Sequence, residues 1–209
     1  MVAAAPTFHN AEIVNENGIS FGKFIINESI INKKFSAGEL AVLGFIPTAS
    51  KLYIKSKFEN LPEWYYKSLV TDYPSQLIIS SHGYAYYINE VMSNYRTGLN
   101  GSATDTFLKK TKQEKIRYIN GFIYILSNFN EYSNYKYAKE VEKAIISREI
   151  IIIEINKSIK ELKKSRYCKY YNSLGTVEKA KLLIRCYCPD LYNKIAEINL
   201  RIRLKLNDK

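Results

Sequence analysis

The sequence predicts a mainly α-helical protein with a minor β part, an α+β protein in which a small mixed N-terminal region precedes a basic C-terminal helical bundle. Three observations lead to this expectation. Capped segments with helical periodicity fill the chain after Ser102, an Ile- and Phe-rich segment occupies residues 19–35, and the positive charge lies almost entirely after Leu108. A chain of 209 residues with 46% hydrophobic residues can bury a core as one domain or as two small ones.

The first fifty residues predict a loose arm, two strands and a helix. Residues 1–17 have no periodicity and are expected to form the arm. Residues 19–35 read as two short strands that turn near Asn27. The Ser36–Glu39 spacing is a capping box, which predicts a helix that ends before Pro47. Residues 39–52 also have the rhythm of a helix-turn-helix motif.

The next fifty residues predict further short elements and a boundary. Pro62 suits the first turn of a helix that ends before Pro74, and residues 84–95 are expected to be helical. The Gly- and Asn-rich residues 96–104 form the clearest loop. The sequence therefore predicts a near-neutral mixed region over 18–101 and a basic helical region over 102–209, two regions that are also compatible with one continuous domain.

The C-terminal half predicts helices. One is expected to start near Ser102, and residues 134–166 form the best long helix because Val141, Ile145, Ile152 and Ile155 follow helical spacing. A strand over 150–153 is the minor alternative. Gly175 breaks the chain before a helix that runs to Cys188. The tail from Ile198 to Leu206 alternates apolar and polar residues, and helix or strand stays open there.

The charge is one-sided. Residues 1–108 contain 8 Lys and Arg against 9 Asp and Glu, whereas residues 109–209 contain 23 against 11. A basic surface attracts polyanions, which are nucleic acid, an anionic membrane surface or an acidic protein. The competing explanation is composition: Ile, Lys, Asn and Tyr make up 87 of the 209 residues, which indicates an AT-rich gene that accumulates lysine.

The number and spacing of the cysteines and the residues at the N-terminus indicate the cellular compartment. Cys168, Cys186 and Cys188 are odd in number and lack the spacing of a disulfide framework, which favours a reducing environment. Residues 1–6 lack the features of a signal peptide, and the apolar runs are too short or too charged to span a bilayer. We therefore expect a cytoplasmic protein in a reducing intracellular compartment. If the source is viral, the location would be the host cell or the virion.

No catalytic, metal or cofactor site is predicted. His82 lies beside Ser80 and Ser81, but adjacent residues rarely form a nucleophile and base, and the nucleophile-elbow pattern is absent. The cysteine spacing is poor for zinc, because paired ligands usually have two or more residues between them.

Basic and aromatic residues alternate in the C-terminal half. Cations neutralise phosphates while exposed tyrosines stack on bases, so this interleaving favours nucleic acid; the alternative is that the tyrosines cover the edge of a core. The predicted nucleic-acid-binding residues are Lys109, Lys110, Lys112, Lys115, Lys136, Lys139, Arg166, Tyr167, Lys169, Tyr170 and Tyr171.

These observations predict a non-catalytic nucleic-acid-binding protein of a virus, phage or plasmid with an AT-rich genome. Its role would be packaging, coating, or control of replication or transcription. Two alternatives stay open. One is a structural, assembly or host-interaction protein, such as a virion component that forms homo-oligomers through its helical faces. The other is an enzyme with a dispersed site.

Overall fold

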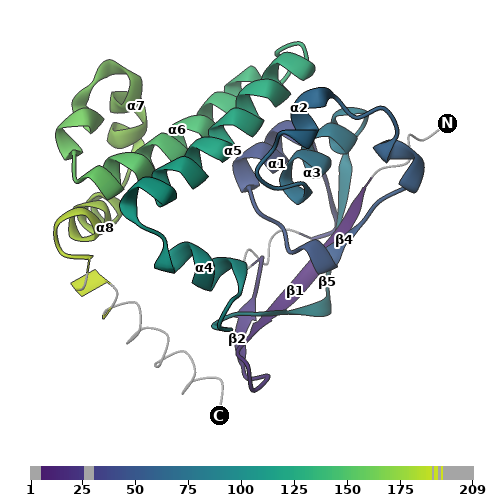
Figure 1. Ribbon diagram of the computed structural model, residues 1–209, viewed down its shortest axis with the longest axis horizontal. Helices are drawn as coiled ribbons and strands as arrows, with labels where there is room; N and C mark the ends of the chain where they lie inside the picture. Colours follow the sequence, from purple (N-terminus) through teal and green to yellow (C-terminus); the bar gives the residue numbers. More distant parts are fainter. Residues whose placement is uncertain (1–5, 26–30, 190, 193, 195–209) are drawn as a thin grey trace. The chain divides into compact units, whose positions relative to one another are not determined.

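The chain is an α+β protein, as the sequence predicts (Figure 1). A computed structural model describes residues 6–25, 31–189, 191, 192 and 194. The structure divides into two compact units. Unit 1 comprises Met1–Lys110 and Asn120–Ile145, and unit 2 comprises Thr111–Ile119 and Ile146–Lys209. The expected boundary at residues 101 and 102 therefore differs from the structural division, in which two long helices contribute residues to both units.

The sheet of unit 1 has mixed topology. Its strands are β1 (Thr7–Val14), β2 (Ser20–Lys23), β3 (Lys33–Phe35), β4 (Lys51–Leu52) and β5 (Ala85–Arg96). The strand order is β2-β1-β5-β3, and β4 pairs with β1 as well. β1 and β5 are parallel, while β2 and β4 are antiparallel to β1 and β3 is antiparallel to β5. The parallel pair requires a long crossover connection, which residues 15–84 provide.

The expectation of a loose arm over residues 1–17 is wrong for the described part, because β1 lies inside the sheet. Phe8, Ala11 and Val14 are buried in β1, and so is the polar Asn10. The Asn10 side chain accepts from the backbone N–H groups of Ala11 and Ile25 and donates to the carbonyl of Ile25, each at 3.0 Å. This polar residue interrupts the apolar pattern, yet it satisfies backbone groups where the β1–β5 register shifts.

Helix α1 (Ala37–Leu43) confirms the predicted capping box. The Glu39 N–H donates to Ser36 Oγ at 3.1 Å, and the Ser36 N–H donates to Glu39 Oε2 at 2.9 Å. The helix ends at Gly44, whose φ of 81° favours glycine. A short 3₁₀ helix (Thr48–Ser50) and strand β4 follow, so the helix-turn-helix interpretation of residues 39–52 is wrong.

Two further expectations differ from the structure: the length of the helix that ends before Pro74 and the helix over residues 84–95. Helix α2 (Glu63–Tyr66) ends before Pro74, as predicted, but is shorter than expected, and a separate helix that the sequence did not indicate, α3 (Asp72–Ser81), contains Pro74. Pro74 lies in the first turn of α3, where its missing N–H leaves no helix hydrogen bond unmade. Strand β5 (Ala85–Arg96) replaces the helix expected over residues 84–95, because the Tyr, Ile and Val side chains of this segment suit a pleated surface.

Two long helices complete the core of unit 1. The helices are α5 (Lys112–Tyr132) and α6 (Ala138–Asn156), and a short α4 (Ala103–Lys109) precedes them with Ser102 as its N-cap. The part of α5 in unit 1 contributes the fully buried Ile125, Leu126 and Phe129, which share a hydrophobic cluster with Phe8, Leu40, Leu77 and Tyr87.

Unit 2 has its own small core. Its elements besides the ends of α5 and α6 are a 3₁₀ helix (Ile159–Lys163), α7 (Ser165–Ser173) and α8 (Thr176–Tyr187). Ile150, Ile153, Leu162 and Leu182 form its buried cluster. The predicted single helix over 134–166 is wrong: α6 ends at Asn156, because Lys157 takes a left-handed φ of 56° that turns the backbone. The alternating tail from Ile198 to Leu206 lies outside the described residues.

Candidate functional site

The charge of the chain is concentrated in unit 2. The sequence assigned to unit 2, about a third of the chain, holds 18 Lys and Arg against 8 Asp and Glu, a net charge of +10. Unit 1 holds 13 against 12, a net charge of +1. The structural division therefore concentrates the charge in fewer residues than the split of the sequence at Leu108.

The predicted nucleic-acid-binding residues are divided between the two units. Lys109, Lys110, Lys136 and Lys139 belong to unit 1, whereas Lys112, Lys115, Arg166, Tyr167, Lys169, Tyr170 and Tyr171 belong to unit 2. Of those in unit 1, Lys109 pairs with Asp105 at 2.8 Å, and Lys136 lies over the Tyr137 ring at 5.2 Å. Each unit is therefore considered by itself.

Arg166 of unit 2 is held by a carboxylate of its own chain. Its Nε donates to Glu149 Oε2 at 2.9 Å and its Nη2 to Glu149 Oε1 at 3.1 Å. This two-pronged contact joins α7 to α6 and offsets the guanidinium charge. Arg166 therefore has a structural task that the sequence did not reveal, because Glu149 lies 17 residues away.

The three predicted tyrosines of α7 serve the core of unit 2. Tyr167, Tyr170 and Tyr171 are partly buried and pack against the cluster of Ile150 and Leu162. Lys179 lies over the Tyr171 ring at 5.2 Å. The packing supports the alternative in which these tyrosines cover the edge of a core, and it leaves only part of each ring open to solvent.

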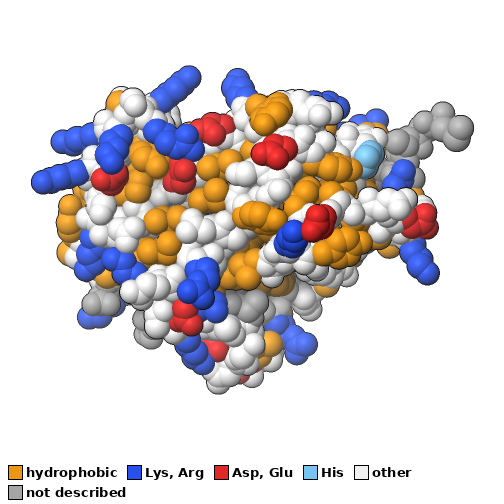
Figure 2. Space-filling view, turned by 45° about the horizontal axis from the view of Figure 1, so that its top comes forward, with side chains coloured by type: hydrophobic (Ala, Val, Ile, Leu, Met, Phe, Trp, Pro, Cys, Tyr) orange, Lys and Arg blue, Asp and Glu red, His pale blue; other side chains and the backbone are white. Residues whose placement is uncertain are grey.

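Exposed lysines surround α7. Lys169 of α7 is exposed, and so are Lys157, Lys160 and Lys163, which precede α7. Figure 2 shows Lys and Arg side chains projecting from the part of unit 2 that carries α7, at the left of the view. Lys157, Lys160 and Lys163 are not among the predicted binding residues, because no aromatic residue lies between them. Their signal is the run of basic residues from 157 to 164.

A second Arg–Glu pair joins α8 to α6. Arg185 Nη2 donates to Glu154 Oε1 at 2.8 Å. Burial raises the pKa of the Glu154 carboxyl, and the nearby Arg185 charge opposes that shift. Glu149 and Glu154 thus attach α7 and α8 to α6 through arginines, and the net positive charge of unit 2 comes mainly from its lysines.

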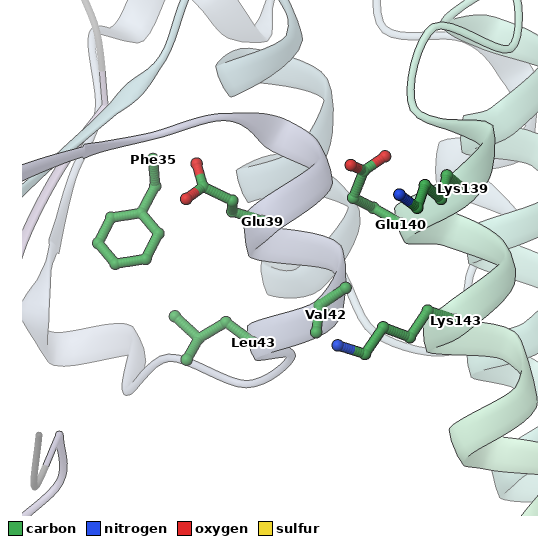
Figure 3. Close-up of a pocket in the computed structure, with 7 residues that line it drawn as sticks. All are labelled: Phe35, Glu39, Val42, Leu43, Lys139, Glu140 and Lys143. Atoms are coloured by element: carbon green, nitrogen blue, oxygen red, sulfur yellow. The ribbon is translucent and has the colours of Figure 1, made fainter. Parts of the chain in front are cut away.

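A pocket of about 410 Å³ lies between α1 and the beginning of α6 in unit 1 (Figure 3). Val42 and Leu43 supply its apolar side, and Lys139, Glu140 and Lys143 reach it from α6. Its Glu39 carboxylate is already engaged by the capping box and by Lys33 at 2.7 Å. These hydrogen bonds give Glu39 a structural role in holding α1.

The hydrogen-bond partner of His82 is a tyrosine and not one of the neighbouring serines. Its Nε2 lies 3.1 Å from the Tyr132 hydroxyl, a partner 50 residues away. Ser80 is fully buried, and the Ser81 hydroxyl donates to the carbonyl of Ile78 at 2.7 Å. Neither serine therefore forms a hydrogen bond with His82 in the described structure, and no sequence pattern points to Tyr132.

The cysteines are free thiols: Cys168 is partly buried, Cys186 is buried and Cys188 is exposed. Burial raises the pKa of the Cys186 thiol, which keeps it protonated. Among the described residues, no group of three or more His, Cys, Asp or Glu side chains could hold a metal ion. No helix in the described part of the chain has the length and apolar character needed to cross a membrane.

The chain matches no protein-family model, no curated protein and no solved structure.

Proposed function

We propose that the protein binds nucleic acid without catalysis, through phosphate contacts made by the lysine-rich surface of unit 2. The observation that carries the proposal is the net charge of +10 in unit 2, against +1 in unit 1. Two of its acidic side chains, Glu149 and Glu154, are engaged by arginines, while Lys157, Lys160, Lys163 and Lys169 are exposed. Such a surface neutralises phosphates and has little means of reading bases.

The proposed setting follows from the same features. A lysine-rich protein from an AT-rich gene suits a virus, phage or plasmid, where it would package, coat or control nucleic acid. The three free thiols support a reducing, cytoplasmic environment. The partly buried tyrosines of α7 would contribute less to binding than the lysines, because only exposed ring faces can stack on bases.

A pair of charge-reversal variants tests the proposal. Lys163→Glu combined with Lys169→Glu changes two exposed residues of unit 2, and Lys55→Glu combined with Lys143→Glu changes two exposed residues of unit 1. Both variants lower the net charge equally. Affinity for a random-sequence duplex is measured by fluorescence anisotropy between about 50 and 200 mM salt.

The unit 2 variant should bind more weakly and flatten the plot of log affinity against log salt, by about 0.9 for each phosphate that is no longer neutralised. The unit 1 variant should retain most of the wild-type slope. Equal weakening in both variants would show that only total charge matters. If folded wild type retains no DNA or RNA at about 50 mM salt, nucleic-acid binding is wrong, and assembly with another protein becomes the better explanation of the charge.

A further inference from the structure

A polar pocket of about 310 Å³ lies at the surface of unit 1, where the end of α3 meets the turn between α5 and α6 and where His82, Asn134 and Lys136 are exposed. Two short segments form it, one from each side. The residues that line it are Ser81, His82, Tyr132, Ser133, Asn134, Lys136 and Tyr137. The pocket is separate from the one in Figure 3, which shares none of these residues.

The chemistry of the lining favours an anion. His82 and Lys136 are the groups that can carry positive charge, and no carboxylate is among the described residues that line the pocket. The Ser133 hydroxyl donates to the carbonyl of Asn130, as Ser81 does to that of Ile78. Among the other donors of the lining are the Lys136 ammonium, the Asn134 amide and the imidazole.

Tyr132 contacts the exposed imidazole of His82. The Tyr132 hydroxyl lies 3.1 Å from His82 Nε2, and Tyr132 makes edge-on ring contacts with both His82 and Trp64. Burial raises the pKa of Tyr132, so its hydroxyl stays neutral. A ligand would thus meet a histidine that is already oriented, which lowers the entropic cost of binding.

The backbone brings a helix start to the same place. Asn134 and Tyr135 have φ values of 50° and 59°, and this left-handed pair turns the chain so that α6 begins at Ala138. α6 is 19 residues long, and the N-terminus of a helix carries partial positive charge. The helix end adds to the charge of Lys136 in attracting an anion.

We propose that this pocket binds a phosphate group, with Lys136 as its cationic partner and the His82 imidazole and the Asn134 amide as further donors. The proposal does not rest on nucleic-acid binding by unit 2, because every lining residue belongs to unit 1. The phosphate could be that of a small phosphomonoester or that of a nucleic-acid backbone. The recognition chemistry is the same for both sources.

The two histidines of the chain provide a direct test. His82 lines the pocket, whereas His9 lies in β1 with its Nδ1 2.8 Å from the Asn10 carbonyl oxygen, so His9 is a reference signal in the same molecule. Inorganic phosphate is titrated into the full-length protein at constant pH and ionic strength, with chloride as the replaced anion. The ring proton signals of both histidines are followed by NMR.

The His82 signals should move with a saturable, single-site dependence on phosphate, while those of His9 stay in place. Lys136→Gln should weaken this binding about tenfold or more, because it removes a charge-assisted contact. Lys139→Gln, an exposed lysine three residues away that lines the pocket of Figure 3, should leave it unchanged. Equal shifts of both histidines, no shift at all, or equal weakening by both variants would overturn the proposal.

A second titration identifies the source of the phosphate. Glycerol phosphate and an oligonucleotide without terminal phosphates are compared in wild type and in the Lys163→Glu, Lys169→Glu variant. A His82 shift with glycerol phosphate alone supports a small phosphomonoester, and a shift with the oligonucleotide supports a backbone phosphate. Inorganic phosphate should bind the variant as it binds wild type, so that loss of polymer binding and loss of pocket binding are separate results.

Discussion

Replacing Asn10 with alanine tests whether β1 belongs to the folded core. The wild-type side chain is buried and makes three hydrogen bonds to the backbone of Ala11 and Ile25. Asn10→Ala leaves these three backbone groups without their partner. A buried group without a partner costs about 1–3 kcal/mol, and water can reach Ile25 in part, so we expect a loss near the lower limit per group, about 3 kcal/mol in all.

Urea unfolding followed by tryptophan fluorescence measures this loss. The chain has a single tryptophan, Trp64, which packs against the core of unit 1, so its signal reports the unit that contains β1. With a denaturant dependence of about 2 kcal/mol per molar urea, a loss of about 3 kcal/mol lowers the midpoint by about 1.5 M.

Asn15→Ala is the matched control. The Asn15 side chain accepts from the N–H groups of Asn17 and Ile19, each at 2.9 Å, but it does so at the exposed turn after β1. Water replaces an exposed partner, so the loss should stay below about 1 kcal/mol. If Asn10→Ala is as mild as Asn15→Ala, the N-terminal segment is a loose arm and the description of β1 as a core strand is wrong.

Three further changes probe the same unit. Ser36→Ala should lower the free energy of urea unfolding by about 1 kcal/mol, because it removes the side chain that caps α1. Leu126→Ala should lower it by about 2–5 kcal/mol, because removal of this fully buried side chain leaves a cavity. An unchanged urea midpoint in either variant would contradict the corresponding assignment. Burial lowers the pKa of Lys51, so the unfolded chain binds its proton more tightly than the folded protein does. The stability of wild type relative to Lys51→Met should therefore rise as the pH increases toward the ordinary lysine pKa of 10.5, and a flat difference would refute the burial of a charged amine.

Local signals in the sequence predict local structure well. The capping box at Ser36 depends on a residue three positions away, and the start of α4 at Ser102 depends on the same kind of contact with Asp105. Both predictions are confirmed, because the interactions that decide them lie within one helical turn. The α+β class is confirmed for a similar reason, since it depends on many short-range patterns at once.

Long-range pairing decides the elements that sequence patterns miss. Residues 84–95 contain enough apolar side chains for a helix pattern, yet they form β5 because β1 and β3 offer their backbone groups on both sides. Asn10 is a residue type typical of loops, and its role depends on Ile25, which no periodicity indicates. Pro74 favours a helix end when it follows a helix, but it is tolerated in the first turn of a helix, and only the structure shows that α3 starts at Asp72.

The sequence predicts which residue types gather in the candidate site, but it does not predict which of them contact one another. Alternating basic and aromatic residues indicate the region around Arg166, but the contact with Glu149 and the packing of Tyr170 are products of the fold. Pairings such as His82 with Tyr132 join residues 50 positions apart, and a single sequence carries no trace of them.

The parallel pairing of β1 with β5 imposes an order on synthesis. Thr7 pairs with Tyr86, so β1 must wait for its parallel partner until 79 residues later, whereas its antiparallel partners β2 and β4 are synthesised earlier. At about 5–20 residues per second, that wait is roughly 4–16 seconds. During this time β1 can pair with β2 and β4, but the edge that β5 covers in the finished sheet stays open. That open edge can pair with another chain, so this interval is the stage of synthesis most exposed to aggregation.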